Sequence, residues 1–398
     1  MAKFDPVPVS RCAGFRAGIQ SPEKMKIKSI ILFAALLPLF DAVAHDGHET
    51  NEVTLLLPVQ MVPERKPPVK PLITLAKSNG IPTSGQGAWT FMALTNVLPI
   101  PAAAQGAVKG AHGTIIVDPD RDTVYWGLQG VGWIAFSNNL TESWIVKGDP
   151  TLAEGNIHGA ELIKRPRGQL PLVVAADNVK HRVFVSDTSF TNVQILGYPA
   201  NSGKYTNAAQ FKPTDATWVN TNRFWVTDGY GEGWVSEATA FPLDYTGVVF
   251  GGHTMSKTPH GVTYDPKTKD LIVAARPEGK FVLWNLRSNA VVKTHFLPGA
   301  EFKGKPSVPT VCDYELWGDY AVVPCLDGPG GIPGPIYILN RKKWEIVSIV
   351  YPKTELGFTL AQHIHDATLY EHKGHLWLLF TNWNPGGIGA AELVRVTE

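Results

Sequence analysis

Short apolar runs separated by turn residues dominate the chain from residue 111 onward. Runs of four to six residues rich in β-branched and aromatic side chains, such as those at 114–117, 271–274 and 320–323, are bounded by Gly, Pro, Asn and Asp. Runs of this length and composition are typical of β-strands. Beyond residue 44 no segment keeps the 3.6-residue period of an amphipathic helix. The pattern therefore predicts an all-β fold.

The strand pattern repeats six times. Each repeat begins at a comparable short segment, and the middle residues of these segments are separated by 46, 56, 46, 52 and 53 positions. The middle residues are, in chain order, His112, His158, Thr214, His260, Cys312 and His365. A period of about 40–55 residues built from short strands is typical of a β-propeller, in which each repeat forms one four-stranded blade. We therefore expect a six-bladed β-propeller over residues 111–398, with each middle residue at the start of an innermost strand beside the central channel.

The chain before the repeats divides into two parts. Residues 45–110 begin as a polar, proline-rich lead-in, which we interpret as a linker and an N-terminal strap with one weak strand signal at 89–97. Residues 1–44 comprise an upstream extension and a signal peptide at 25–44, with a basic start, a short apolar run and the small-residue pattern Ala42-Val43-Ala44. This predicts a secreted or periplasmic protein that leaves the membrane after signal cleavage. A retained membrane anchor is the alternative, although the apolar run is short for a bilayer span.

The overall charge argues against one class of partner. The sequence has 36 basic and 35 acidic residues, and this balance gives no electrostatic reason to bind nucleic acid. The twelve tryptophans fit a fold rich in aromatic strands. We expect a small-molecule or peptide substrate.

Two cysteines flank a predicted hairpin in the fifth repeat. Gly318-Asp319 suits a two-residue turn, which places Cys312 directly opposite Cys325. In an exported protein such a pair can form a cross-strand disulfide if the Cβ atoms approach to about 3.5–4.5 Å. The alternative is two reduced cysteines, one of which faces the channel.

Four of the six shared positions are histidines, which predicts a metal site. Side chains far apart in sequence meet at the channel if the repeats surround one axis. Three or four imidazoles can hold Zn²⁺ and leave one position for water or substrate. The loops after the second strands open at the same end of the channel, because adjacent strands run antiparallel. These loops carry Gln129, Asn178, Tyr230, Arg276, Asp327 and Trp383. A concave mouth with a few polar groups is the usual place for a small-molecule site.

Several of these motifs together resemble a known family. The segment 224–231 looks like the blade that carries the catalytic tyrosine of peptidyl-α-hydroxyglycine α-amidating lyases, which are six-bladed propellers of the NHL-repeat type. That family binds zinc through histidines in Pro-His-Gly, Pro-His-Ser and Pro-His-Asp. The segments around His158, His260 and His365 match these in order, and 274–279 is similar to the family's Ala-Asp-Arg-Glu-Asn-Gly.

The resemblance implies a role for each matched residue. The three matched histidines would bind zinc, and Tyr230 would take the proton of a substrate hydroxyl while the carbinolamide C–N bond breaks to an amide and glyoxylate. Arg276 would pair with a substrate carboxylate through its planar guanidinium. Asp366 would be a ligand of a structural calcium ion. The residues alone also allow a packed aromatic at Tyr230, a solvated charge at Arg276 and a capping carboxylate at Asp366.

Several positions depart from the family's pattern. The loop at 128–132 lacks the substrate-handling arginine of the first blade, and Gly231 stands where the family has a half-cystine. His363 replaces a methionine two residues before the last histidine, and His112 adds an imidazole to the ring. His112 and His363 are therefore candidate extra ligands. Four or five nitrogens would suit copper or iron as alternatives to zinc.

We interpret the chain as an exported metal-dependent lyase that acts on a small hydroxyl- or carbonyl-bearing substrate. The leading alternative is a non-catalytic propeller of the NHL type that binds a ligand or a protein. Further alternatives are a metal-dependent hydrolase and a copper redox protein. His45 and His48, at the amino terminus that cleavage would create, form a separate candidate metal-binding tract.

Overall fold

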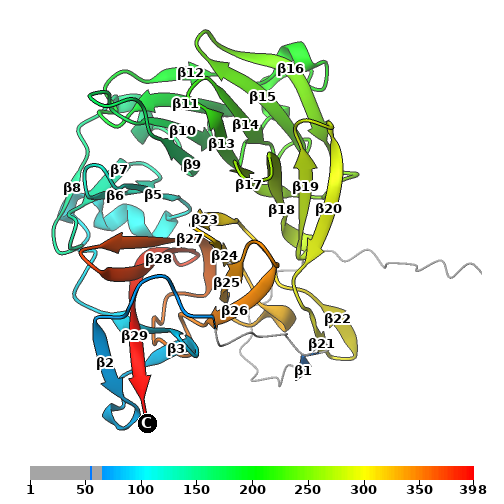
Figure 1. Ribbon diagram of the computed structural model, residues 1–398. Coiled ribbons are helices and arrows are strands. Elements are labelled where there is room, and N and C mark those ends of the chain that lie inside the picture. Colours follow the sequence, from blue (N-terminus) through cyan, green and yellow to red (C-terminus); the bar gives the residue numbers. More distant parts are fainter. Residues whose placement is uncertain (1–53, 56–64) are drawn as a thin grey trace, which may run out of the picture. The chain divides into compact units, whose positions relative to one another are not determined.

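Among residues 54–55 and 65–398, which the computed structural model describes, six β-sheets surround a common axis and form a six-bladed β-propeller (Figure 1). The all-β, six-bladed architecture expected from the repeat period is confirmed. The predicted signal peptide at 25–44 and the tract with His45 and His48 lie outside the described residues. None of the helices in the described part of the chain is long and apolar enough to span a bilayer.

Each of the first five blades is an antiparallel sheet whose strands follow chain order from the axis outward. The first blade contains β5 (Ile115–Asp118), β6 (Thr123–Leu128), β7 (Gly132–Phe136) and β8 (Ser143–Ile145). The second contains β9 (Ile157–Ile163), β10 (Leu172–Asp177), β11 (Arg182–Asp187) and β12 (Gln194–Leu196). The third contains β13 (Asp215–Asn220), β14 (Arg223–Thr227), β15 (Trp234–Ala240) and β16 (Leu243–Gly251). The fourth contains β17 (Pro259–Asp265), β18 (Asp270–Ala275), β19 (Lys280–Asn285) and β20 (Ala290–Phe296), and the fifth contains β23 (Glu315–Trp317), β24 (Tyr320–Pro324), β25 (Ile336–Asn340) and β26 (Glu345–Val350).

The sixth blade combines the two ends of the described chain. Its inner strands are β27 (His363–His372), β28 (His375–Trp383) and β29 (Gly387–Thr397), and its outer strands are β4 (Trp89–Leu94) and β3 (Thr83–Gln86). β29 pairs with β28 on one side and with β4 on the other, and β2 (Ile73–Ala76) adds a parallel pairing at the end of β29. The strand signal at 89–97 thus corresponds to β4. Because β4 comes from N-terminal sequence, its backbone hydrogen bonds to β29 join the two ends of the described chain and close the ring.

The remaining elements are short. A separate three-stranded sheet contains β1 (Thr54–Leu55), β21 (Ala300–Phe302) and β22 (Lys305–Ser307). The 3₁₀ helices are η1 (Lys77–Asn79), η2 (Ala102–Gly110), η3 (Pro150–Ala153), η4 (Ala200–Ser202), η5 (Ala208–Gln210), η6 (Arg276–Glu278) and η7 (Pro329–Gly331).

The core lies between the faces of neighbouring sheets. Between the first two blades, for example, Tyr125 and Trp133 pack against Phe184 and Phe190, and each of the four side chains is at most 5% exposed. Fully burying such a side chain contributes roughly 1.5–3 kcal/mol. Because every blade packs against two neighbours in this way, the inner strands are held at fixed positions around the channel.

Candidate metal centre

A β-bulge marks the start of the inner strand in three blades that carry a histidine. In the second blade the pairing passes from Gly159 opposite Ala176 to Ile157 opposite Asp177, so His158 has no partner in the ladder. In the sixth blade the pairing skips His365 in the same way. A bulge re-aims a side chain that regular pairing would keep on one face of the sheet.

The fourth blade has the same irregularity. Pro259 pairs with Ala275 and Val262 with Val273, which leaves His260 and Gly261 opposite one residue. The bulges therefore occur at corresponding positions of three repeats, at the ends of the inner strands where the sequence places the histidines.

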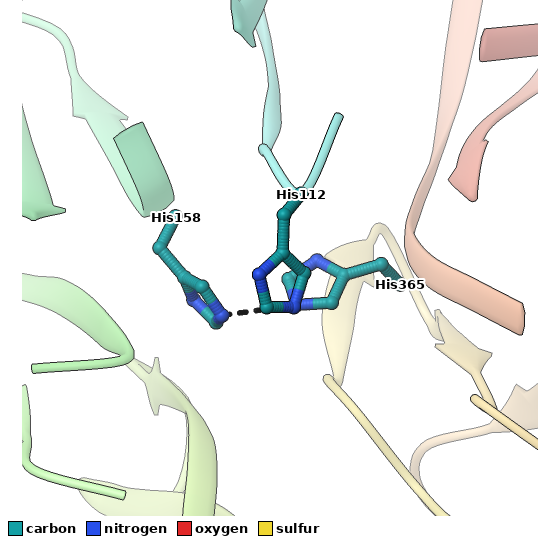
Figure 2. A group of neighbouring side chains, drawn as sticks. All are labelled: His112, His158 and His365. Atoms are coloured by element: carbon teal, nitrogen blue, oxygen red, sulfur yellow. Dashed lines mark hydrogen bonds between the residues drawn. The ribbon is translucent and has the colours of Figure 1, made fainter. Parts of the chain in front are cut away.

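The structure brings four histidines together from different blades. The ring centroids of His112, His158 and His365 lie 4.3–4.5 Å apart. Figure 2 shows these three rings turned toward one another, with a dashed line for the contact between His158 and His365. His260 lies close by, with its ring centroid 5.0 Å from that of His158 and 5.1 Å from that of His365.

Two backbone carbonyls orient the imidazoles. The Nδ1 atom of His158 lies 2.6 Å from the carbonyl oxygen of Thr214, and that of His260 lies 2.9 Å from the carbonyl oxygen of Cys312. A carbonyl oxygen only accepts, so both Nδ1 atoms carry the proton and donate it. In the neutral rings the Nε2 atoms then present their lone pairs. This arrangement is the usual support for a histidine that binds a metal through Nε2.

Burial keeps these histidines neutral. It lowers the pKa values of His158, His260 and His365 well below the ordinary value, and nearby histidines and Arg276 lower them further. The pKa of His112 falls to about 3, first through burial and then through the charge of Arg276. Neutral imidazole is the form that binds metals, so the cluster needs no change of protonation to act as a ligand set near neutral pH.

Tyr230 and Arg276 lie against the histidine cluster. The Tyr230 hydroxyl is 3.1 Å from the Nε2 atoms of both His158 and His260 and 3.5 Å from that of His112. Arg276 Nη1 donates to the same hydroxyl at 2.9 Å, and the guanidinium lies over the tyrosine ring. Burial raises the pKa of Tyr230 to about 12, while the charge of Arg276 opposes the rise. Tyr230 thus occupies a place where its proton can move to or from a group at the cluster.

His363 lies at the mouth rather than in the cluster. Its Nδ1 atom is 2.8 Å from Asp327 Oδ1, and its ring packs near Trp383 at a centroid distance of 5.6 Å. The nitrogen atoms that lie within 4.8 Å of one another come from His112, His158 and His365. Of the two candidate extra ligands, His112 therefore belongs to the cluster and His363 does not. Trp383 is exposed and also packs against His112, so it lines the entrance.

The Cys312–Cys325 disulfide predicted from the hairpin is absent, since both cysteines are free and buried. The hairpin register is the expected one from Glu315, which pairs with Val322, to the turn. The register then shifts by one residue, so that Cys325 forms its bridge with Val311 instead of Cys312. A one-residue shift turns a side chain to the other face, which separates the two thiols. Burial raises the pKa of the Cys312 thiol to about 12.

Asp366 links the sixth blade to the first. Its Oδ2 atom accepts hydrogen bonds from Thr114 Oγ1 at 2.9 Å and from the backbone N–H of Ile115 at 2.5 Å. Its Oδ1 atom is buried and has no hydrogen-bond partner among the described residues. One oxygen therefore acts as a cap, while the other is left for a further ligand. Asp313 and Glu315 lie beside Asp366 and were not among the residues predicted from the sequence. The available signal was an aspartate directly after the shared position in the third, fifth and sixth repeats.

Comparisons with known proteins do not identify a family. No protein-family model matches the chain, and no curated protein matches it. Among solved structures, the chain is similar to Sqt1 of Saccharomyces cerevisiae, with 8% sequence identity, a TM-score of 0.43 and 69% of each chain covered. The match is too distant to bear on the site. The resemblance to α-amidating lyases therefore rests on the sequence motifs.

Proposed function

We propose that the chain is a metal-dependent enzyme whose active site is the histidine cluster in the propeller channel. The observation that carries the proposal is the 3.1 Å separation of the Nε2 atoms of His158 and His365. His158 donates its Nδ1 proton to the carbonyl oxygen of Thr214. The Nε2 atom of His158 therefore carries a lone pair, which is buried and faces the Nε2 atom of His365. A cation shared by the two nitrogens would satisfy both.

The donor set fits a borderline transition metal. His112, His158 and His365 would hold the ion, with His260 as a fourth ligand, and all four contribute neutral nitrogen. Imidazole suits zinc, copper and iron, whereas calcium and magnesium prefer oxygen. Zinc is our first assignment, with copper and iron as the alternatives. A bound divalent ion would polarise a substrate oxygen or lower the pKa of a bound water molecule.

The residues beside the cluster define a reaction type. Arg276, whose planar fork matches a carboxylate, would anchor an anionic substrate at the mouth. The Tyr230 hydroxyl, held by Arg276 and facing two Nε2 atoms, would receive or deliver a proton at a substrate hydroxyl. Proton transfer by a positioned side chain contributes about 10²- to 10⁴-fold to a rate.

The reaction that combines these parts is a carbon–nitrogen lyase reaction on a small hydroxyl- or carbonyl-bearing compound. For an α-hydroxyglycine derivative, the hydroxyl loses its proton, the C–N bond breaks, the nitrogen gains a proton, and an amide and glyoxylate leave. The signal-like segment at 25–44 supports a secreted or periplasmic site of action.

The experiment is turnover of an α-hydroxyglycine peptide by the metal-loaded chain, with glyoxylate as the readout. We expect glyoxylate release by the wild type and a loss of about 10²- to 10⁴-fold in Tyr230→Phe, with bound metal unchanged. Tyr198→Phe, a substitution outside the cluster, is the control and should retain activity. A chain that binds metal but leaves the peptide intact would overturn the lyase assignment. A chain that binds no metal would favour the non-catalytic binding propeller.

A further inference from the structure

The histidine cluster has an open side and a closed side. Three of its members are at most 3% exposed, namely His158, His260 and His365. His112 is only partly buried, and the same holds for Tyr230 and Arg276, which lie against the cluster. A substrate therefore reaches the cluster on the side that these three partly buried residues border.

Trp383 adds a large exposed ring to this open side. All twelve tryptophans lie in the described part of the chain, and only Trp383 and Trp144 are exposed, at 38% and 46%. Trp144 lies on β8, the outermost strand of the first blade, whereas Trp383 is the last residue of β28, next to the innermost strand of the sixth. Its ring centroid is 5.5 Å from that of His112. An exposed aromatic ring beside convergent polar groups is typical of a small-molecule site.

The rings of Tyr230, His112 and Trp383 form a row. The centroids of Tyr230 and His112 are 6.2 Å apart, with 24° between the ring planes, and the planes of His112 and Trp383 differ by 35°. Arg276 holds the Tyr230 hydroxyl at one end of this row. A molecule whose carboxylate pairs with Arg276, and whose reacting atom lies at Tyr230, can therefore place a further group against Trp383.

Neighbouring residues hold the Trp383 ring in place. His363 lies opposite Trp383 in the ladder between β27 and β28, and their ring centroids are 5.6 Å apart. His363 donates from Nδ1 to Asp327 Oδ1 at 2.8 Å, which fixes the imidazole against the indole. The turn after Trp383 packs on η2, because a Cβ atom at Gly386 would collide with the carbonyl oxygen of Val108. A surface held in this way loses little conformational entropy when a ligand binds.

The surroundings of Trp383 favour an uncharged, apolar group. Leu360 is 57% exposed, and its carbonyl oxygen accepts a hydrogen bond from the Asn382 side chain at the end of β28. An indole face also attracts cations. However, the positive guanidinium of Arg276 lies over Tyr230 in the same row, and the Asp327 carboxylate already pairs with His363. A flat aromatic group fits better than a cation, since it stacks on the indole and buries apolar surface.

We propose that Trp383 is the subsite for an aromatic group of the substrate. The substrate class is then an amide of a small carboxylic acid that carries an aromatic acyl group on its nitrogen. Its carboxylate lies on Arg276, its reacting carbon beside Tyr230 and its aromatic ring on Trp383. This inference rests on the proposed function, because it takes the histidine cluster as the reacting centre. It also gives His363 a role at the mouth as the residue that positions Trp383.

The test is the binding of two ligands that differ only in the group that would reach Trp383. N-benzoylglycine and N-acetylglycine share a carboxylate and an amide, and both lack the hydroxyl that the lyase reaction requires. Isothermal titration calorimetry of the full chain should give a Kd about tenfold lower for N-benzoylglycine, because only its ring can stack. Trp383→Ala should bind the two ligands alike, and Trp383→Phe, which keeps an aromatic ring, should retain most of the preference.

Two controls isolate the subsite. Trp144→Ala makes the same substitution at an exposed ring outside the mouth and should keep the tenfold preference. The thermal unfolding midpoint of Trp383→Ala should stay within a few degrees of the wild type, because the ring is exposed.

The inference is wrong if the wild type binds the two ligands equally, if it binds neither at millimolar concentration, or if Trp383→Ala keeps the preference. Failure of the lyase assignment is a separate result. A chain that releases no glyoxylate from the α-hydroxyglycine peptide, yet prefers N-benzoylglycine through Trp383, retains the aromatic subsite.

Discussion

The Nε2 atoms of His158 and His365 lie 3.1 Å apart, although 207 residues separate the two histidines in the sequence. They begin the inner strands of the second and sixth blades, and each sits on a β-bulge. The contact is possible because the propeller brings every inner strand to one axis. It is also the geometry on which the metal assignment rests.

Removing one imidazole should remove the transition metal. We expect His158→Ala and His365→Ala to reduce bound metal from about one ion per chain to a small fraction, because each loses one of three close nitrogen ligands. Inductively coupled plasma mass spectrometry of the purified variants measures the content. His253→Ala, an exposed histidine outside the cluster, should keep the wild-type content. Equal metal in all three variants would contradict the assignment.

His295 should make the chain less stable at acid pH. Its ring stacks on Trp344 at 3.8 Å, and burial followed by the charge of Lys293 lowers its pKa to about 4. Because the folded pKa lies below the ordinary value of 6.5, the unfolded chain binds the proton more readily. The stability that neutral His295 adds to the folded state is present above pH 6.5 and is lost as the pH falls toward 4.

The variant His295→Leu isolates this effect. Urea unfolding at a series of pH values should show a shallower loss of stability between pH 6.5 and about 4 than in the wild type. Parallel curves for the two proteins over this range would show that His295 titrates normally in the folded state.

Both buried cysteines of the fifth repeat should be free thiols. Cys312 and Cys325 are buried, and neither forms a disulfide within the described part of the chain. They should therefore react with a thiol reagent only after denaturation, without prior reduction. Mass spectrometry of the chain alkylated under denaturing conditions counts the modified thiols. A pair of cysteines that becomes reactive only after reduction would show that the disulfide forms in the exported protein.

The closing blade should depend on Trp89. This side chain is fully buried, packs on Tyr320 at 4.6 Å and donates from Nε1 to the carbonyl oxygen of Arg65. We expect Trp89→Ala to lower the free energy of unfolding by about 3–5 kcal/mol, since it leaves a large cavity between the fifth and sixth blades.

Trp144→Ala provides the comparison for Trp89. Trp144 is 46% exposed on an outer strand, and surface substitutions usually change stability by less than about 0.5 kcal/mol. If the two variants lose a similar amount of unfolding free energy, measured by denaturant unfolding, then β4 does not hold the ring closed.

The sequence predicts the large-scale arrangement better than the local geometry. The spacing of the six shared positions was enough to predict six blades, because a repeat period reflects one structural unit. These positions are His112, His158, Thr214, His260, Cys312 and His365. The bulges at His158, His260 and His365 could not be predicted, since one extra residue in a strand leaves the apolar pattern almost unchanged. The same kind of shift near Cys312 made the disulfide prediction wrong.

Two further features depended on contacts between distant residues. β4 gave only a weak strand signal, and its place in the sixth blade arises from pairing with β29 across almost the whole chain. Asp313 and Glu315 were not among the site residues predicted from the sequence. Only the meeting of the fifth and sixth blades at the axis sets them beside Asp366.

X-ray absorption spectroscopy of the metal-loaded full chain tests the central claim most directly. We expect a metal with three or four imidazole nitrogens at about 2.0–2.1 Å, and a loss of imidazole scattering in His158→Ala. Oxygen or sulfur ligands alone, or a chain that retains no transition metal, would show that the histidine cluster is not a metal site.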